Sequence, residues 1–262
     1  MTAQKTVLIT GAGSGIGRAL AIEAAKRGHA LILCGRRAAS LGETAALTEG
    51  PTRVVLADVT TPGGRAALEV ATRDGLDILI NNAGTLSVGH LGDQNDAAIE
   101  TMVCTNLTAP ILLTRDLLPA LRARQGRVVN IGSVFGDIAY PFFATYSATK
   151  FGLRGFSDAL RREMSGQGIS VTYIAPRATH TAAETAFGAL IGPMQMTLDS
   201  PEVVAKQAWN AIARGKRESF PKGKERFFVT VQRLFPRVID ASVGAQARDT
   251  RTLAALRPAS AP

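Results

Sequence analysis

Tyr146 and Lys150 are the residues whose types and spacing most directly indicate chemistry. They lie four positions apart in the stretch Tyr146-Ser147-Ala148-Thr149-Lys150, and residues four apart share one face of a helix. A free tyrosine has a pKa of about 10, which is too high for an acid–base group at neutral pH. A neighbouring ammonium group favours the phenolate and lowers that pKa toward the working pH. Because this spacing is common by chance, further residues have to support the interpretation.

Two more polar residues extend the pattern. Ser133 ends a predicted strand thirteen residues before Tyr146, and its hydroxyl can hydrogen bond a substrate oxygen on which charge develops. Asn106 lies inside a long predicted helix, where asparagine is unfavourable because its side chain competes for backbone hydrogen bonds. With the tyrosine and the lysine, these residues form the candidate catalytic set: Asn106, Ser133, Tyr146 and Lys150.

A glycine-rich turn follows the first predicted strand, in the stretch Thr10-Gly11-Ala12-Gly13-Ser14-Gly15-Ile16-Gly17-Arg18. Glycines let the backbone turn sharply and approach a pyrophosphate, whose negative charge meets the amides at the start of the following helix. The spacing of Gly11, Gly15 and Gly17 differs from the common G-x-G-x-x-G motif. Such a turn can be purely structural, but its position between the first strand and an alanine-rich helix favours phosphate binding.

The residues after the second predicted strand bear on the choice of dinucleotide. The strand ends in Leu33-Cys34-Gly35-Arg36-Arg37. An acidic residue at this point would bind the ribose hydroxyls of NAD, whereas arginine accommodates the 2′-phosphate of NADP through bidentate hydrogen bonds. Gly35 stands where that acid is expected, and Arg36 and Arg37 follow. The sequence therefore predicts NADP(H), with two solvated arginines as the alternative. Ser14 is not basic, so another position that often assists NADP binding is unfilled.

Polar residues also follow the third and fourth predicted strands. Asp58-Val59 comes after the third strand, where an acid can hydrogen bond the edge of adenine, and Asn81-Asn82-Ala83-Gly84 comes at the end of the fourth. The carboxyl ends of strands in an open α/β sheet are where ligands bind. We therefore include both segments in the candidate cofactor site.

The elements that position these residues alternate between short apolar runs and longer helical patterns. This rhythm is typical of βαβ units, and the continuous apolar character of the strands indicates burial on both faces. The sequence predicts an α/β fold, a Rossmann-type doubly wound parallel sheet in a single domain. The expected strands are Thr6–Thr10, Ala30–Cys34, Arg53–Ala57, Ile78–Asn81, Gly126–Gly132 and Ser170–Ala175, and the expected helices include Arg18–Arg27, Ile99–Arg124 and Ser147–Ser165.

Composition and length agree with an enzyme of this class. A chain of 262 residues, 46% hydrophobic and with 26 glycines, suits one compact α/β domain and excludes a disordered or fibrous protein. Its two cysteines, Cys34 and Cys104, argue against a disulfide framework and a secreted protein. Met1–Lys5 leads directly into a strand, with no apolar signal segment, and no apolar run approaches the ~20 residues of a membrane-spanning helix. We expect a soluble cytoplasmic protein.

The net charge of +9 is concentrated near the C-terminus, where twelve Lys and Arg residues stand against five acidic residues after position 200. No nucleic-acid motif accompanies this charge, so we expect no nucleic-acid partner. An apolar stripe in the same segment predicts an amphipathic helix that Pro236 kinks. It either packs on its own domain or a sister subunit, or makes a peripheral contact with anionic membrane. The stripe consists of Phe227, Phe228, Val231, Leu234, Phe235, Val238 and Ile239.

Taken together, these motifs resemble the short-chain dehydrogenase/reductase family. The resemblance runs from about Thr6 to Pro201 and includes Thr-Gly-xxx-Gly-x-Gly, Asn-Asn-Ala-Gly, the helix asparagine, the strand serine and Tyr-xxx-Lys in the family's order. It implies an NADP(H)-dependent enzyme that interconverts a carbonyl and a secondary alcohol. Two regions break the alternation of strands and helices, so we divide the chain into residues 1–221, the NADP-binding Rossmann domain with a mobile substrate loop at 179–200, and residues 222–262, a basic amphipathic C-terminal extension.

The resemblance also assigns roles to individual residues. Tyr146 is the proton donor in reduction and Ser133 holds the carbonyl, while Lys150 lowers the Tyr146 pKa and binds the nicotinamide ribose. Asn106 anchors a water that relays protons to Lys150. The cofactor-binding residues expected from the motifs and from the resemblance are Gly11, Ser14, Gly15, Ile16, Gly17, Arg36, Arg37, Asp58, Val59, Asn82, Ala83, Gly84, Tyr146, Lys150, Pro176, Thr179 and Thr181.

One position departs from the family pattern. The family has Pro-Gly after the sixth strand, but this chain has Pro176-Arg177. Arg177 either decorates the surface or contacts phosphate or substrate, and the residue pattern favours decoration. His29, His90 and His180 share no ligand spacing and no cluster of cysteines or acids joins them, so we expect no metal site.

Large apolar residues surround the candidate catalytic set in the sequence. They are either ordinary core or the lining of a pocket for an apolar or 3-oxoacyl-type ketone. Arg124 matches one residue with which 3-oxoacyl reductases dock an acidic carrier protein, but Gln167 replaces the second. The set comprises Val134, Phe135, Phe142, Phe143, Phe187, Leu190, Ile191, Met194 and Met196.

Two alternative functions remain open at this stage. One is an NADP-binding module that senses redox state, which the complete catalytic set argues against, and the other is an NAD-dependent alcohol dehydrogenase. The resemblance also implies a homodimer or homotetramer built through the helices that carry Asn106 and Tyr146.

Overall fold

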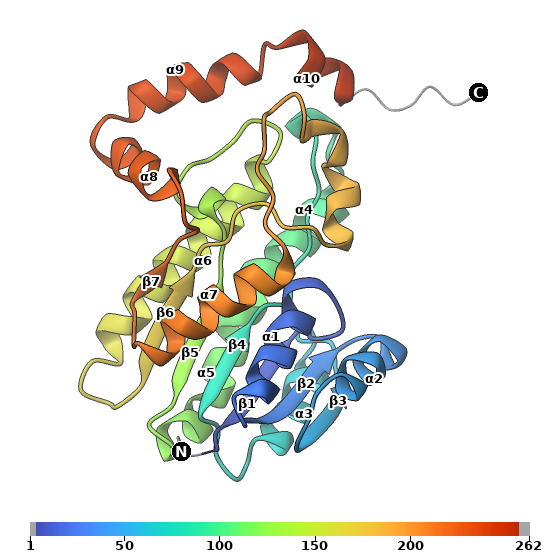
Figure 1. Cartoon of the computed structure of the whole chain (residues 1–262), viewed down its shortest axis with the longest axis vertical. Coiled ribbons are helices and arrows are strands. Elements are labelled where there is room, and N and C mark those ends of the chain that lie inside the picture. Colours follow the sequence, from blue (N-terminus) through green and yellow to red (C-terminus); the bar gives the residue numbers. More distant parts are fainter. Residues whose placement is uncertain (1–3, 257–262) are drawn as a thin grey trace.

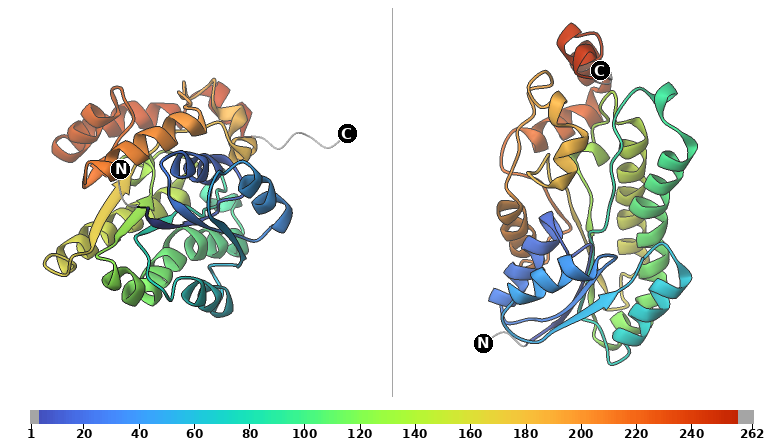
Figure 2. Two further views of the ribbon diagram at one scale, coloured as in Figure 1. Left: turned by 60° about the horizontal axis from the view of Figure 1, so that its bottom comes forward. Right: turned by 90° about the vertical axis from the view of Figure 1, so that its right-hand side faces the viewer.

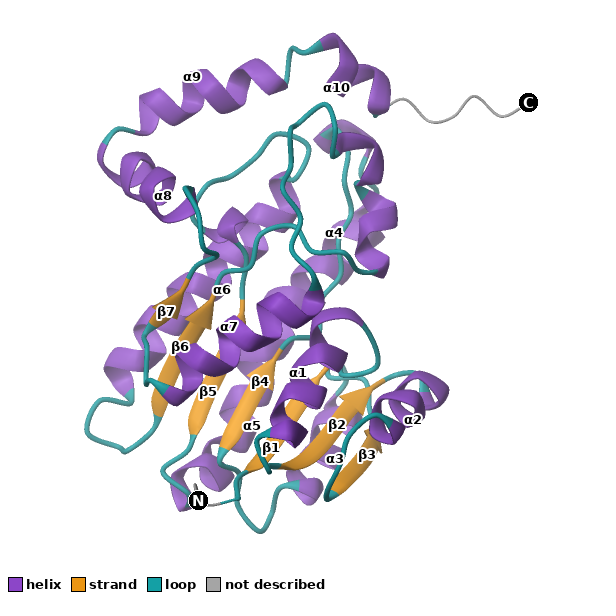
Figure 3. Cartoon of the chain, in the orientation of Figure 1, coloured by secondary structure: helices purple, strands orange, loops and turns teal. Residues whose placement is uncertain are grey.

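Seven parallel strands form one sheet in the order β3-β2-β1-β4-β5-β6-β7 (Figure 3). The computed structural model describes residues 4–256. Six strands match the predicted ones to within one residue at each end, and the short seventh strand was not predicted. The strands are β1 (Thr6–Thr10), β2 (Ala30–Gly35), β3 (Thr52–Leu56), β4 (Ile78–Asn81), β5 (Arg127–Ile131), β6 (Ser170–Ile174) and β7 (Glu218–Ser219).

Helices cover both faces of the sheet (Figure 2), which confirms the prediction of a doubly wound α/β fold. Alternate residues of each strand point to opposite faces: Val7 and Ile9 pack in the layer of α1 and α7, and Leu8 packs in the layer of α3, α5 and α6. The helices around the sheet are α1 (Gly15–Lys26), α2 (Ala38–Ala46), α3 (Pro62–Ala71), α4 (Asp96–Val103), α5 (Ala109–Ala123), α6 (Ala144–Glu163) and α7 (Pro201–Ala213).

Strand β3 departs from the expectation of burial on both faces. It lies at the edge of the sheet, and the side chains of Val54 and Leu56 are exposed. An edge strand has a neighbour on one side only and less helix cover, so its apolar sequence does not guarantee burial.

Helices α4 and α5 are joined into one helix, Asp96–Ala123, by a π-helical turn at Cys104–Thr108. This helix is apolar and long enough, by length and composition alone, to cross a membrane, contrary to the expectation from the sequence. Leu113 and Leu117 pack in the core on the sheet, so in the folded domain it is a core helix.

The C-terminal segment forms three helices, α8 (Glu225–Leu234), α9 (Pro236–Gln246) and α10 (Thr250–Ala255). They arch across the end of the molecule that lies beyond the carboxyl ends of the strands (Figure 1). The single kinked helix expected from the sequence is therefore two helices, because Pro236 begins α9. Val229 and Ile239 anchor them on the domain beside Ile138. The division of the chain into residues 1–221 and 222–262 stays a prediction. Residues 1–3 of the first part and 257–262 of the second lie outside the described range.

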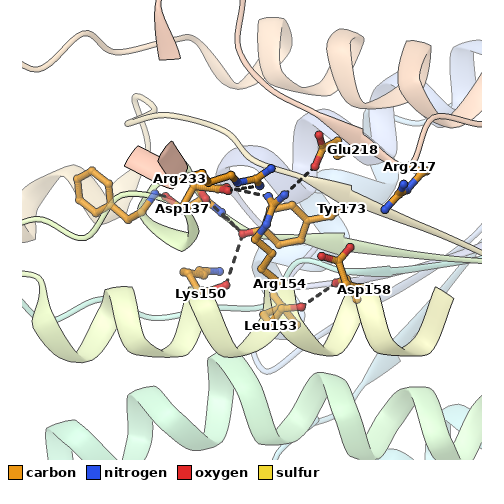
Figure 4. A network of polar contacts seen from close by, with 12 residues as sticks. Asp137, Lys150, Leu153, Arg154, Asp158, Tyr173, Arg217, Glu218 and Arg233 are labelled. Atoms are coloured by element: carbon orange, nitrogen blue, oxygen red, sulfur yellow. Dashed lines mark hydrogen bonds and ion pairs between the residues drawn. The ribbon is translucent and has the colours of Figure 1, made fainter. Parts of the chain in front are cut away.

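A polar network joins α8 to the sheet (Figure 4). Asp137 is almost fully buried and accepts hydrogen bonds from Arg154 of α6 at 2.8 Å and from Arg233 of α8 at 2.9 Å. Arg154 also pairs with Glu218 of β7 at 2.7 Å. Burial raises the pKa of Asp137, although both arginines act to lower it. Such a desolvated acid is stable only while its cationic partners remain.

We expect Arg154→Met to lower the free energy of unfolding by about 3 kcal/mol, because it leaves the buried Asp137 with a single, half-exposed arginine. Urea denaturation at neutral pH measures the change. Adding Asp137→Asn to the same variant should recover much of the loss, since the amide carries no charge. Equal stability of Arg154→Met and the wild type would show that the network does not stabilise the fold.

Candidate functional site

A cavity of about 660 Å³ lies at the carboxyl ends of the central strands. This is the point where the strand order reverses, between β1 and β4, and open α/β sheets bind ligands there. Every residue expected to bind the cofactor lines this cavity, as do Ser133, Tyr146 and Lys150. Asn106 is the one candidate that does not line it. The fold thus brings together side chains that are up to 170 positions apart in the sequence.

The glycine-rich turn forms one wall of the cavity by very close packing. Gly11 has a φ of 65°, in the region that favours glycine. A Cβ on Gly17 would collide with the carbonyl oxygen of Gly11 and lie 2.6 Å from Nδ2 of Asn82. Helix α1 starts directly after Ser14, whose side chain makes no capping hydrogen bond. Its first amides are therefore free of a capping side chain, as a phosphate site at a helix N-terminus requires.

Asn82 shapes this turn from the β4 side. Its Nδ2 donates hydrogen bonds to the carbonyl oxygens of Thr10 at 2.9 Å and Gly11 at 3.3 Å. The Thr10 hydroxyl accepts from the backbone amides of Asn82 and Ala83, both at 3.0 Å. Asn82, which we expected to bind the cofactor, lines the cavity, and its side chain holds the turn.

Arg18 is a positioning residue that the sequence analysis did not single out. Its guanidinium donates to the carbonyl oxygen of Gly13 at 2.7 Å and pairs with Glu43 of α2 at 2.6 Å. The same side chain hydrogen bonds Thr44. It therefore fixes the outer part of the glycine turn against α2. The available signal was an arginine directly after the last glycine.

Arg36 and Asp58 line the part of the cavity where we expect the adenosine half of the dinucleotide to bind. The Arg36 side chain is 77% exposed, and its only ion pair among the described residues is a 4.0 Å contact with Asp58. Hydrogen bonds from Thr60, at 2.9 and 2.7 Å, lower the pKa of Asp58 and keep it ionised. The Arg36 guanidinium is thus free to meet an anionic ligand at the cavity mouth.

The candidate catalytic residues meet at the other end of the cavity. Surrounding protein raises the pKa of Tyr146 to about 12, and a hydrogen bond to the Ser133 hydroxyl acts to lower it. Lys150 Nζ lies 5.5 Å from the centre of the Tyr146 ring and donates to the carbonyl oxygen of Ile131 at 3.1 Å. Burial lowers the pKa of Lys150 to about 8.

The direction of the Tyr146 shift is opposite to the predicted one. We expected Lys150 to lower the Tyr146 pKa, but desolvation is the largest influence and moves it upward. The physical reason is the apolar wall around the ring, where Phe135 lies 6.3 Å from it, centre to centre. Desolvation penalises a phenolate.

Asn106 holds the backbone next to the cavity. Its Oδ1 accepts from the amide of Thr85 at 2.8 Å, and its Nδ2 donates to the Thr85 carbonyl at 2.9 Å and to Thr149 at 3.3 Å. These bonds tie the segment after β4 to α6. The side chain is fully engaged, so the predicted anchoring of a water cannot come from a free side-chain amide.

Arg177 is neither surface decoration nor free. It pairs with Asp199 at 2.7 Å and with Glu225 at 2.6 Å, and these bonds raise its pKa. Asp199 closes the 179–200 loop, because it bridges Thr179. Arg177 therefore joins both ends of the loop to the start of α8, while also lining the cavity.

The apolar residues near Tyr146 divide into lining and core. Phe135, Phe143, Phe187 and Met196 line the cavity, and another group packs behind them in the same cluster. The 179–200 loop contributes two short 3₁₀ turns, Ala182–Ala186 and Gly188–Leu190, and packs against α10. The residues behind the lining are Phe142, Leu190, Ile191 and Met194.

Within residues 4–256, no three His, Cys, Asp or Glu side chains come together as metal ligands. The cavity is lined mainly by backbone amides, one lysine, arginines and hydroxyls, with Asp58 as its one carboxylate. This set fits a large phosphorylated ligand.

Comparison with known proteins gives matches over most of the chain. A family model described as short chain dehydrogenase matches residues 5–189. Dehydrogenase/reductase SDR family member 7B from Bos taurus is 37% identical over 233 residues, which cover 81% of this chain and 71% of that protein.

Solved structures give the same picture. A short-chain dehydrogenase from Sphingobium yanoikuyae in complex with NADPH has a TM-score of 0.78 and 30% identity, and covers 98% of both chains. Its match therefore extends into the C-terminal helices. The 3-ketoacyl-(acyl-carrier-protein) reductase from Brucella melitensis complexed with NADH has a TM-score of 0.73 and 27% identity, over 79% of this chain and 90% of its own.

The depressed pKa of Lys150 predicts how stability depends on pH. The folded chain disfavours the ammonium, so its cost is full below about pH 8 and vanishes above about pH 10.5. Lys150→Met should therefore raise the free energy of unfolding of the cofactor-free protein at neutral pH by about 2 kcal/mol, after the lost hydrogen bond to Ile131 is subtracted.

This gain should shrink as the pH rises between those two values. Urea denaturation at neutral pH and at about pH 10 measures it, and Lys206→Met, on the exposed side of α7, serves as the control. A gain that is the same at both pH values would contradict the lowered pKa.

Proposed function

This chain belongs to the short-chain dehydrogenase/reductase family, and from that premise we propose that it uses NADP(H) to interconvert an apolar ketone and its secondary alcohol. That it is an oxidoreductase follows from the family. The single observation that carries the finer proposal is one cavity lined by Tyr146, Ser133, Lys150 and the exposed Arg36.

Each polar residue at the catalytic end of this cavity has its own role in the proposed reaction. Bound nicotinamide supplies or accepts the hydride. Ser133 hydrogen bonds the substrate oxygen and Tyr146 gives that oxygen a proton in the reductive direction. A Tyr146 pKa of about 12 keeps the phenol protonated at neutral pH, which is the form that a proton donor requires. Lys150, with a pKa of about 8, changes charge close to working pH and supports proton transfer to Tyr146.

The preference for NADP(H) rests on the strand end after β2. Gly35 leaves room beside Leu41, and Arg36 extends into solvent with only a 4.0 Å ion pair. An exposed guanidinium binds a phosphate with little loss of existing interactions. One neighbour holds NADPH and another NADH, so the preference needs a direct measurement.

The proposed substrate is an apolar or 3-oxoacyl-type ketone. Phe135, Phe143, Phe187 and Met196 give the catalytic end of the cavity an apolar wall, and such a wall favours apolar ligands. Delivery on a carrier protein is not part of the proposal, because Gln167 stands where the second docking arginine is expected and bonds Arg122 instead. A screen of ketones and free 3-oxoacyl thioesters, followed by NADPH absorbance, identifies the substrate.

We also propose a cytoplasmic homodimer or homotetramer. Two large apolar side chains, Val103 of α4 and Phe151 of α6, are exposed on neighbouring helices. These helices carry or adjoin the site residues, so assembly through them would also brace the site. Sedimentation velocity of the wild type and of Phe151→Asp tests this part.

We expect Tyr146→Phe to lower turnover at least roughly hundredfold, because it removes the transferable proton. The dissociation constant for NADPH should be nearly unchanged, since the ring remains. Steady-state kinetics on a verified substrate and fluorescence titration of NADPH measure the two effects. Tyr140→Phe, in the same aromatic cluster but outside the cavity, is the matched control. Wild-type turnover by Tyr146→Phe would refute the assigned role.

For the cofactor, we expect NADPH to bind at least roughly tenfold more tightly than NADH, a difference of about 1.4 kcal/mol. Gly35→Asp with Arg36→Ala should reverse the preference, because the new carboxylate can accept from ribose hydroxyls. The Cβ of the aspartate would meet only Leu41 atoms at 3.4–3.7 Å, so the fold should tolerate it. Arg73→Ala, outside the cavity, should change neither affinity. Equal affinities in the wild type would overturn the proposal.

A further inference from the structure

Helices α8 and α9 expose a row of large apolar side chains that the domain does not cover. This apolar ridge consists of Phe227, Phe228, Leu234, Phe235 and Val238, which are 66%, 42%, 65%, 62% and 59% exposed. The opposite side of the same helices is anchored by the buried Val229 and Ile239. Both helices lie at one extremity of the molecule (Figures 1 and 2), so the ridge is accessible to a large partner.

A second feature, a cavity of about 910 Å³, opens beside α8. Five basic residues line it, and they are Arg154, Lys216, Arg217, Arg226 and Arg233. Arg154 and Arg233 are paired with Asp137 and Glu218, and Asp158 is paired with Arg161. The other three cations, Lys216, Arg217 and Arg226, give this cavity, here called the basic cavity, its positive charge.

More cations flank the ridge on the same segment. Lys222, Lys224 and Arg237 are exposed, whereas the acid at the start of α8, Glu225, points inward to Arg177. Against these three exposed cations stands one exposed acid on α9, Asp240, so the charge around the apolar ridge is positive. This combination of aromatic side chains and surrounding cations is typical of helices that lie in a membrane interface.

The charge pattern decides between two occupants of this face. A second copy docking through the same face would bring these cations against one another, because a two-fold contact places a patch on itself. An anionic bilayer instead offers an apolar interior to the ridge and phosphate groups to the cations.

We propose that α8 and α9 dock the protein on an anionic bilayer, with the apolar ridge in the interface and the exposed Lys222, Lys224 and Arg237 at the lipid phosphates, while the basic cavity adds to the attraction by its charge. Docking there places the 179–200 loop beside the bilayer, because Arg177 joins that loop to Glu225 at the start of α8. The surface is separate from the cavity that holds Tyr146 and Lys150.

Vesicle co-sedimentation of the full chain, without substrate or cofactor, tests the proposal independently of the reaction. The protein should bind vesicles of phosphatidylcholine mixed with phosphatidylglycerol and bind phosphatidylcholine alone at least roughly tenfold less. Binding to the mixture should also fall at least roughly tenfold when salt rises from about 0.05 M to about 0.5 M, since screening acts on exposed charges.

Two pairs of substitutions separate the contributions of the ridge and of the cations that flank it. Phe227→Ser with Phe235→Ser should weaken binding to the mixed vesicles at least roughly tenfold. Lys224→Gln with Arg237→Gln should weaken it roughly 25-fold, about fivefold for each cation. Two matched control pairs lie far from α8 in the sequence, and both should bind as the wild type does. They are Leu56→Ser with Val70→Ser and Arg53→Gln with Arg73→Gln. Arg53 and Leu56 lie on β3, Val70 lies in α3 and Arg73 follows α3.

The substituted side chains are exposed, so circular dichroism should show folded variants. The proposal is overturned if the full chain ignores the mixed vesicles at low salt, or if the controls weaken binding as much as the test pairs. It is also overturned if the ridge variant changes the oligomer mass in sedimentation velocity while the wild type does not bind vesicles. That last result would assign the ridge to a second copy.

Discussion

The close approach of α1 to the ends of β1 and β4 is the constraint on which the rest of the site depends. Gly17 has no room for a Cβ against the carbonyl of Gly11, and Asn82 Nδ2 donates a hydrogen bond to the same carbonyl oxygen. Arg18 then fixes the turn to α2. Because these contacts hold the start of α1 against the carboxyl ends of β1 and β4, the first backbone amides of α1 line the cavity. The glycine turn is therefore a packing device as well as a phosphate site.

The pKa values of Tyr146 and Lys150 follow from burial more than from neighbouring charges. Tyr146 and Lys150 are moved in opposite pKa directions by the same apolar surroundings, which disfavour both the phenolate and the ammonium. The consequence is a tyrosine that keeps its proton near neutral pH beside a lysine whose neutral and charged forms are close in free energy there. The cost is an interior that is less stable than an apolar one.

The C-terminal helices are attached to this machinery by arginines. Arg233 reaches the buried Asp137, and Arg177 links Glu225 to the loop end at Asp199. Apolar contacts of Val229 and Ile239 complete the attachment. The segment is consequently part of the folded body on its inner side, while its outer side keeps aromatic residues exposed. The two helices that meet at Pro236 thus have an inner side that packs on the domain and an outer side that exposes aromatic residues to solvent.

The sequence alone determined six of the seven strands, the glycine turn and the candidate residues Ser133, Tyr146 and Lys150 that line the cavity, since strand periodicity, glycine spacing and helical spacing are local patterns. It did not determine what depends on distant partners. The Tyr146 pKa shift, the engagement of Asn106 with Thr85 and the ion pairs of Arg177 all arise from residues brought together by folding. Desolvation and pairing are properties of a three-dimensional neighbourhood, and no spacing along the chain encodes which neighbours will surround a side chain.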